Sequence, residues 1–268
     1  MLILAFLLLA FGAAFIYVRL CGFVIWKTAL LFAGCFLALN LLYFTVVWVA
    51  TWFINQTKPI TRQSSVCRTG CLYVAYLLTG YAWVRTHVRG LEKLPEPDRF
   101  LLVCNHRSMF DPAVIVRKLG KFNISFVSKP SNMKIPLFGT MGYGAGYLAI
   151  DRENDRKALT TILTAADYLK KGICSMGIFP EGTRSRGGEL LPFHAGSFKI
   201  AQKANVPLVI TSVSGTEKIK KNLFRRPTDV YLDILEVIPA DKVKSMSTVE
   251  LAAYSSRLIE ENLKAVPA

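Results

Sequence analysis

Metal-binding cysteine patterns, acidic residues and charged residues near the N-terminus are all scarce in this sequence. The six cysteines form no CxxC pair and have no cluster of further metal ligands around them, so they indicate neither a zinc site nor a disulfide framework. No GxSxG sequence occurs either. Because a serine hydrolase acting on lipids would need that nucleophile elbow, this class of enzyme is disfavoured.

The shortage of acidic residues gives the 268-residue chain a net charge of +15, from 33 Lys and Arg against 18 Asp and Glu. Such a charge favours an anionic partner: nucleic acid, anionic lipid or a phosphorylated substrate. The chain has no recognition helix, zinc-finger spacing or RNA-binding aromatic motif, and its long apolar segments indicate a membrane instead. Nucleic acid is therefore the least favoured of the three.

Charged residues are missing altogether from residues 2–18 and 28–54. Each stretch is near or above the ~17 to 25 residues that a membrane-spanning helix needs. A cleaved signal peptide would begin with basic residues, whereas Arg19 and Lys27 follow the first stretch, so retained membrane helices are favoured. The connection between the stretches is mostly apolar, which leaves a tight hairpin in one leaflet as an alternative to two full spans.

Basic residues are more frequent after the second apolar stretch than between the two stretches, and the positive-inside rule then places the rest of the chain in the cytoplasm. The residues concerned are Lys58, Arg62, Arg68, Arg85, Arg89 and Lys93. Residues 55–70 are polar and basic, as in a linker at the level of the lipid headgroups. Residues 71–84 are uncharged and rich in Tyr and Trp, which indicates a helix at the membrane interface or an ordinary core helix.

From residue 87 onward, short apolar segments typical of strands alternate with longer segments of helical periodicity. This alternation predicts an α/β domain. Helices are expected from Asp111, over 155–171 and 196–204, and after a capping box at Ser247 to Glu250. Strands are expected at 86–88, 100–104, 124–127, 147–150, 175–179, 207–213 and 230–238.

The segment NHRSMFD, residues 105–111, follows the expected strand at 100–104 and is the first candidate site. A loop at the end of a buried strand is a common place for reacting groups. His106 can accept a proton on one ring nitrogen while Asp111 holds the other, which fixes the tautomer and stabilises the imidazolium. This pair is a general base without its own nucleophile. Alternatively, Asp111 only caps the helix that begins with Pro112.

Basic residues also follow other expected strands. In FPEGTRS, residues 179–185, Gly182 permits close approach of a ligand and Arg184 offers a planar fork that matches a phosphate group. Lys129 follows the strand at 124–127, and Arg152 follows the strand at 147–150. Taken singly, each is also explained as a solvated charge on a surface turn. Their recurrence after strands of one domain favours a site for a phosphorylated ligand.

Together these segments resemble the glycerolipid acyltransferases, and most closely the bacterial 1-acylglycerol-3-phosphate acyltransferases. The resemblance covers about residues 87–215 and rests on NHRSMFD at 105–111, AIDR at 149–152, FPEGTRS at 179–185 and VPLVITSV at 206–213. The first and third motifs stand in the family's order, 70 residues apart from Asp111 to Glu181. The lysine loop departs from the family pattern, because Pro130-Ser131-Asn132 occupy the place of its usual acidic residue.

The resemblance implies an α/β fold of the glycerol-3-phosphate acyltransferase type, with a mixed sheet flanked by helices and preceded by N-terminal membrane helices. It implies transfer of an acyl group from acyl-CoA or acyl-acyl carrier protein, as co-substrate, to the sn-2 hydroxyl of lysophosphatidic acid. No metal or other cofactor is expected. His106 and Asp111 would be catalytic. The implied substrate-binding residues are Lys129 and Arg184 for the phosphate, Glu181, Gly182 and Thr183 around the glycerol, and Arg152 for positive potential nearby.

The expected organisation is a membrane anchor of two helices at 1–56, an interfacial linker and helix at 57–86, and a catalytic domain at 87–268 that faces the cytoplasm from the cell membrane. The expected partners are the lipid bilayer, lysophosphatidic acid and the acyl donor, but not nucleic acid. Glycerol 3-phosphate or another lysophospholipid is an alternative acceptor. A non-catalytic module that binds anionic lipid is a further alternative, but it leaves His106 and Asp111 without a purpose.

Overall fold

The computed structural model describes residues 2–95, 99–151, 153–186 and 188–265. It divides into two compact units, Met1–Asn55 and Gln56–Ala268.

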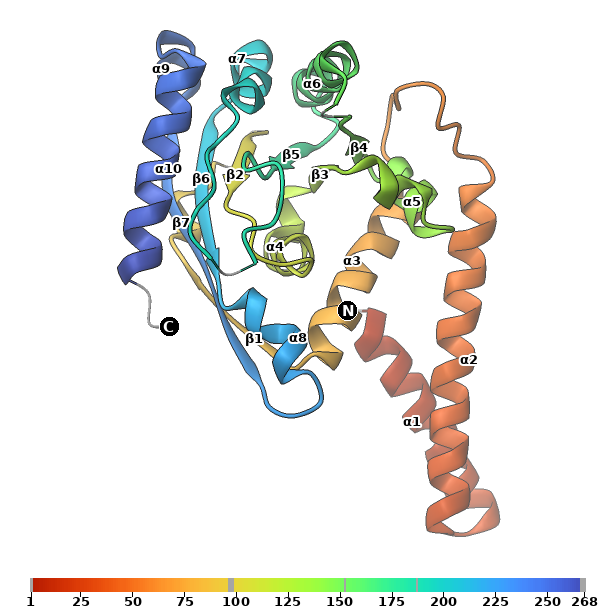
Figure 1. Cartoon of the computed structure of the whole chain (residues 1–268). Coiled ribbons are helices and arrows are strands. Elements are labelled where there is room, and N and C mark those ends of the chain that lie inside the picture. The colour runs from red at the N-terminus through yellow and green to blue at the C-terminus, as the bar shows by residue number, and fades with distance from the viewer. Residues whose placement is uncertain (1, 96–98, 152, 187, 266–268) are drawn as a thin grey trace. The chain divides into compact units, whose positions relative to one another are not determined.

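The first unit is a pair of long helices, α1 (Leu2–Cys21) and α2 (Ile25–Thr51), joined by residues 22–24 (Figure 1). Its buried side chains include the small residues Ala10 and Ala14, which permit close approach of helices. Large apolar side chains cover most of its surface. Each helix is long and apolar enough to cross a membrane. So much exposed apolar surface indicates that lipid covers it, and we infer that the protein is associated with a membrane.

The second unit is built on a seven-stranded sheet with the order β1-β7-β6-β2-β5-β3-β4. The neighbours β6, β2, β5, β3 and β4 run parallel, whereas β7 and β1 run antiparallel to them. This mixed sheet confirms the predicted fold class, and every expected strand is present. The strands are β1 (Val84–Arg89), β2 (Leu101–Cys104), β3 (Ile124–Ser128), β4 (Leu148–Ala149), β5 (Ser175–Ile178), β6 (Leu208–Ser214) and β7 (Thr228–Ile238).

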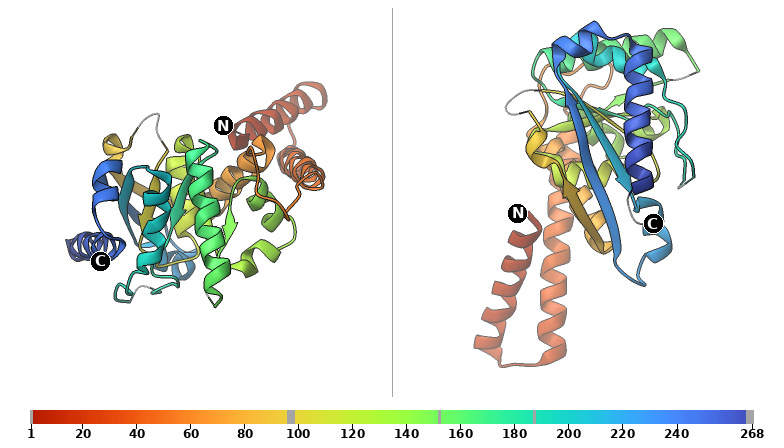
Figure 2. Two further views of the ribbon diagram at one scale, coloured as in Figure 1. Left: turned by 90° about the horizontal axis from the view of Figure 1, so that it is seen from above. Right: turned by 90° about the vertical axis from the view of Figure 1, so that its left-hand side faces the viewer.

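Helices cover both faces of this sheet (Figures 1 and 2). On one face lie α3 (Ser65–Tyr81) and α4 (Asp111–Leu119), and on the other lie α6 (Asp155–Lys170), α7 (Lys199–Ala204), α9 (Ala240–Ser245) and α10 (Thr248–Ala265). Two short helices are α5 (Phe138–Gly144) and α8 (Ile219–Asn222). The 3₁₀ segments are η1 (Leu91–Lys93), η2 (Gly120–Phe122), η3 (Pro130–Lys134), η4 (Ala195–Phe198) and η5 (Thr216–Lys218).

Strand β2 shows why the two faces carry separate cores. Side chains alternate along a strand, so Leu101 and Val103 join the cluster under α6 and α7, while Leu102 and Cys104 join the cluster under α4. All four side chains are fully buried. A strand buried on both faces reads as an unbroken apolar run, which is what the sequence has here. Burial of each leucine stabilises the fold by about 1.5 to 3 kcal/mol.

Several helix boundaries differ from the sequence predictions. Helix α3 begins at Ser65, inside the segment 55–70 expected to be a linker, because the Ser64 side chain accepts a hydrogen bond from the Cys67 N–H (3.3 Å) and caps the helix. One face of α3 is buried, including Tyr73, so it is a core helix on that side. The segment 196–204 divides into η4 and α7, and α5, α8 and α9 were not predicted.

The strand directions decide which loops meet. The carboxyl ends of β6, β2, β5, β3 and β4 all lie at one edge of the sheet, and the first residues of β7 and β1 lie at the same edge because those strands run the other way. The loop after β2, which holds His106, is therefore in the middle of this edge. The ends of β6, β7 and β1 lie to one side of it, and the ends of β5, β3 and β4 lie to the other. The loop after β5 returns toward the histidine loop, where the Ser185 N–H donates to the His106 carbonyl.

Candidate active site

The loop after β2 is fixed to the neighbouring strand by Asn105. This buried residue donates a hydrogen bond from Nδ2 to the Val213 carbonyl (2.9 Å) and accepts one at Oδ1 from the Val213 N–H (2.8 Å). The side-chain amide thus pairs with β6 as a strand residue would. His106, the next residue, starts from a defined position at the edge of the sheet.

His106 and Asp111 are in direct contact. Nδ1 of His106 lies 2.7 Å from Oδ2 of Asp111. The Asp111 side chain is fully buried, whereas 19% of the His106 side chain is exposed. A substrate can therefore reach the histidine while the carboxylate stays shielded from water.

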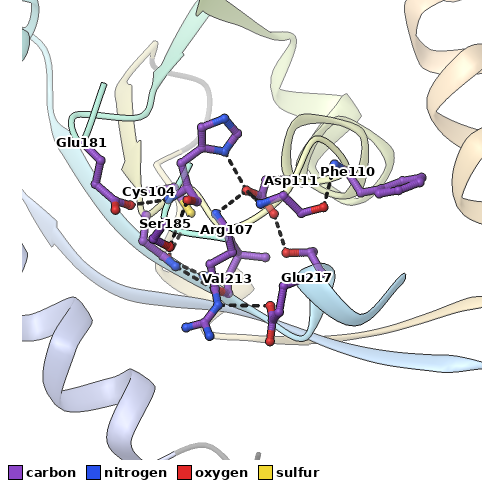
Figure 3. A network of polar contacts seen from close by, with 12 residues as sticks. Cys104, Arg107, Phe110, Asp111, Glu181, Ser185, Val213 and Glu217 are labelled. Atoms are coloured by element: carbon purple, nitrogen blue, oxygen red, sulfur yellow. Dashed lines mark hydrogen bonds and ion pairs between the residues drawn. The ribbon is translucent and has the colours of Figure 1, made fainter. Parts of the chain in front are cut away.

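Asp111 collects further hydrogen-bond donors (Figure 3). Its Oδ2 accepts from the backbone N–H groups of Arg107 and Ser108, both at 2.8 Å, and its Oδ1 accepts from the hydroxyl of Thr216 at 2.5 Å. A carboxylate surrounded in this way acts only as an acceptor, so Nδ1 of His106 must carry the proton that lies between them. Nε2 is then the unprotonated nitrogen, and it has no hydrogen-bond partner among the described residues.

The hypothesis that Asp111 only caps a helix is wrong. Helix α4 begins at Asp111 itself, its N-cap is Phe110, and no side chain caps it. Pro112 does lie in the first turn, as the sequence predicted. The carboxylate points toward residues 106–108 instead. Its Oδ2 there binds three donors, which are Nδ1 of His106 and the backbone N–H groups of Arg107 and Ser108.

The imidazole ring is also held on its face. Phe179 stacks on His106 with ring centroids 4.2 Å apart and planes inclined by 18°, and Phe126 stacks on Phe179 at 5.3 Å. Together with the bond from Nδ1 to Asp111, this stack fixes the ring orientation. Sequence reasoning gave Phe179 no role, although it is the first residue of the FPEGTRS motif.

The loop after β5 is tied to the histidine loop through Glu181 and Ser185. Oε1 of Glu181 accepts from the His106 backbone N–H (2.5 Å), Oε2 accepts from the Leu191 N–H (3.0 Å), and the Ser185 N–H donates to the His106 carbonyl (2.8 Å). Burial raises the pKa of the Glu181 carboxyl, and the hydrogen bonds from His106 and Leu191 oppose that shift. Glu181 therefore fixes the position of the loop that holds His106. Whether it also shapes a glycerol site stays a prediction.

Gly182 makes the sharp turn in this loop possible. Its φ is +77°, a conformation that strains most other residues, and its N–H donates to the Phe179 carbonyl (3.1 Å). The turn carries the chain from the strand end toward Thr183 and Arg184, which are exposed.

The loop after β6 supplies residues that the sequence analysis missed. Thr216 binds Asp111, and the neighbouring Glu217 pairs with Arg107, with 3.0 Å between Oε2 and Nε (Figure 3). One signal could have found them: they follow the predicted strand at 207–213, and residues after parallel strands meet at one sheet edge.

The remaining predicted residues lie on the same edge. Lys129 and Arg184 are exposed in the loops after β3 and β5, and neither forms an ion pair with a described residue. Arg152 lies outside the described residues, so its role in providing positive potential stays a prediction. The structure therefore brings His106, Asp111 and Glu181 into contact, and the phosphate-binding roles of Lys129 and Arg184 remain predictions.

A thiol nucleophile is not part of this site. Cys104 is fully buried, and burial, with the Asp111 and Glu181 carboxylates nearby, raises the pKa of its thiol well above the ordinary value. It is therefore a neutral packing residue. Across the described ranges, no group of three or more His, Cys, Asp or Glu side chains is arranged to hold a metal ion.

Comparison with known proteins gives consistent matches. The model of the Acyltransferase family matches residues 85–214. The 1-acyl-sn-glycerol-3-phosphate acyltransferase of Salmonella typhimurium is 35% identical over 164 residues, which are 61% of this chain and 66% of that protein. The protein of the same name from Haemophilus influenzae is 34% identical over 166 residues, 62% of this chain and 68% of the relative. The aligned region thus spans about two thirds of these relatives.

A solved structure also matches: the crystal structure of the 1-acyl-sn-glycerophosphate (LPA) acyltransferase PlsC from Thermotoga maritima, with a TM-score of 0.62, 22% identity and coverage of 100% of both chains. This likeness shows a shared fold. A mixed α/β sheet with a His–Asp pair at its carboxyl edge is the class defined by the structure. The sequence matches identify the family: the chain belongs to the acyltransferase family that includes the 1-acyl-sn-glycerol-3-phosphate acyltransferases.

Proposed function

We propose that the protein transfers a fatty acyl group from a thioester to the sn-2 hydroxyl of 1-acylglycerol 3-phosphate, which gives phosphatidic acid. The observation that carries this proposal is the His106 imidazole, with its Nδ1 bound to buried Asp111 and its Nε2 without a partner among the described residues. Family membership and the names of the relatives support the choice of substrates.

The reaction needs no nucleophile from the protein. Nε2 of His106 accepts the proton of the sn-2 hydroxyl while the oxygen attacks the thioester carbonyl carbon, and Asp111 stabilises the imidazolium that forms. The tetrahedral intermediate then collapses, the carbon–sulfur bond breaks, and the leaving thiolate takes the proton from the imidazolium. An ester and a free thiol result, and His106 returns to its starting state.

The site suits this chemistry better than hydrolysis through an enzyme nucleophile. The hydroxyls of Ser108 and Ser185 bind backbone groups, accepting from the Phe110 N–H and donating to the His106 carbonyl, and neither contacts the imidazole ring. Cys104 is buried and neutral. A general base contributes about 10²- to 10⁴-fold, and the rest of the acceleration comes from holding both substrates in line.

The phosphate of the acceptor is assigned to the side of the sheet edge formed by the loops after β5, β3 and β4. Arg184 and Lys129 are exposed in the loops after β5 and β3, without ion-pair partners in the described ranges. The sequence resemblance assigns Arg152 to the same ligand. A guanidinium fork and an ammonium group are suited to a phosphate monoester.

The membrane helices place the enzyme where its lipid substrate and product reside. By the distribution of Lys and Arg around α1 and α2, the catalytic unit faces the cytoplasm. Protease protection of the second unit in right-side-out and inverted vesicles tests this orientation.

The function is tested with the purified full chain, a labelled long-chain acyl thioester, and a panel of acceptors: lysophosphatidic acid, other lysophospholipids and glycerol 3-phosphate. We expect transfer to lysophosphatidic acid to be the most efficient. His106→Ala should abolish transfer, whereas Asp167→Ala should retain it, because Asp167 forms only an exposed ion pair with Lys171 (2.7 Å) and lines neither proposed substrate site. If the protein prefers another acceptor, that acceptor replaces lysophosphatidic acid as the proposed substrate. An active His106→Ala protein would refute the proposed mechanism.

A further inference from the structure

A cavity of about 880 Å³ lies on the other side of the histidine loop, where the loops from β6, β7 and β1 meet. The residues that line it come from distant parts of the sequence. They include Arg85 in β1, Arg107 beside the catalytic histidine, Lys218 after β6, Asn222 in α8, and Arg226 just before β7. The volume is in the range of ordinary ligand pockets, about 300 to 1,000 Å³.

The lining of this cavity is strongly basic. Arg186 joins Arg85, Arg107, Lys218 and Arg226 there. The two carboxylates in the lining are already engaged, since Glu217 pairs with Arg107 and Asp229 pairs with His87. The other four cations form no ion pair with a described residue. A concave surface with uncompensated positive charge favours a ligand with several negative charges.

Part of the cavity is rigidly built. Asn222 is buried; its Nδ2 donates to Oγ1 of Thr228 (3.0 Å) and its Oδ1 accepts from Nε of Arg226 (3.1 Å). The Arg226 N–H also donates to the Asn222 carbonyl (3.1 Å). Arg226 is therefore held at its base while its terminal guanidinium nitrogens remain available. Preorganised donors of this kind reduce the entropic cost of binding a phosphate.

The position of the cavity separates it from the proposed acceptor site. His106 is in the middle of the sheet edge. Lys129 and Arg184 follow β3 and β5 and do not line this cavity, which lies on the β6–β7–β1 side and takes Arg186 from the loop after β5. Arg107 of the histidine loop lines the cavity, so a ligand there contacts the residue next to His106. An acyl transfer needs two substrates that approach one base together, and the two basic regions provide one place for each.

We propose that this cavity binds the phosphorylated nucleotide end of an acyl-coenzyme A donor, an inference that rests on the proposed function. Coenzyme A carries a pyrophosphate and a 3′-phosphate at the end opposite its thiol, and the cations of the lining match that charge. A carrier protein offers a single phosphodiester, which would leave most of the cations in the lining without a partner. The thioester then reaches His106 past Arg107.

The test measures KM for each substrate separately with the full chain in detergent. Arg85→Ala and Arg226→Ala should each raise KM for palmitoyl-CoA about tenfold, as expected for the loss of a charge-assisted contact. KM for lysophosphatidic acid should stay unchanged. Palmitoyl-pantetheine, which lacks the nucleotide, should be a poorer donor for the wild type and should be unaffected by either substitution.

The matched control is Arg225→Ala, which removes an exposed arginine next to Arg226 that does not line the cavity. It should leave both KM values unchanged. The proposal is overturned if KM for lysophosphatidic acid rises in place of KM for palmitoyl-CoA, if neither KM changes, or if the wild type accepts only acyl-acyl carrier protein. A wild type inactive with every donor would instead contradict the proposed function.

Discussion

Replacing Asp111 by asparagine separates the charge of this residue from its geometry. Oδ2 of Asp111 faces three donors, the N–H groups of Arg107 and Ser108 and Nδ1 of His106, whereas Oδ1 faces only the hydroxyl of Thr216. A hydroxyl can accept as well as donate. The asparagine oxygen therefore fits the Oδ2 position, and its NH₂ group fits beside Thr216 once that hydroxyl rotates.

Asp111→Asn should thus keep the fold and the tautomer of His106 but lose the negative charge that stabilises the imidazolium. The lost charge-assisted bond is worth about 1.5 to 3 kcal/mol. At 1.36 kcal/mol per tenfold change in rate, kcat should fall about 10- to 150-fold. The kcat of the His106→Ala protein should fall further, because this substitution removes the whole general-base contribution of about 10²- to 10⁴-fold.

The assay is kcat at saturating concentrations of both substrates, with circular dichroism and thermal unfolding to verify the fold. Asp167→Asn is the matched control, since Asp167 forms an exposed ion pair with Lys171 on α6. An Asp111→Asn protein with the activity of the wild type would refute the mechanism. An Asp111→Asn protein that folds normally but is as inactive as His106→Ala would refute the argument that the amide fits without disturbing the tautomer.

Three further predictions concern residues around this pair. Arg184→Ala should raise KM for lysophosphatidic acid about 10- to 100-fold, because one charge-assisted hydrogen bond is lost. An unchanged KM would show that Arg184 does not bind the phosphate. Phe179→Ala removes the ring stacked on His106. Because an aromatic pair contributes ~0.5 to 1.5 kcal/mol, kcat should fall about two- to tenfold. An unchanged kcat would show that Asp111 alone orients the imidazole ring. Glu181→Gln should change how stability depends on pH. Because burial raises the pKa of the Glu181 carboxyl above 4.5, the folded state holds this proton to a higher pH than the unfolded chain does. Its contribution to stability is greatest below the unfolded pKa and is lost as pH rises through the folded value. The Tm of the wild type relative to Glu181→Gln should therefore fall with rising pH above about 4, as measured by thermal unfolding, and a constant difference would contradict this.

The sequence by itself predicted the strands, the two long N-terminal helices and the pairing of His106 with Asp111. Apolar runs bounded by turn residues predicted central strands such as β2, because a strand buried on both faces needs such a run whatever its neighbours are. The edge strand β1 instead alternates between exposed and less exposed positions. Length and lack of charge likewise predicted the two N-terminal helices, since both are local properties. His106 and Asp111 could be paired because they are five residues apart on one loop, and Glu181 was selected from its motif.

Only the tertiary structure decided what surrounds that pair. Thr216 is 105 residues from Asp111 in the sequence, yet it binds the carboxylate because β6 lies beside β2 in the sheet. Phe179 reaches the imidazole because β5 lies on the other side. The basic cavity depends on β7 and β1 running antiparallel to the rest, which places Arg85 and Arg226 at the edge that holds the histidine. Strand order and direction are set by packing of the whole sheet, and no local pattern records them.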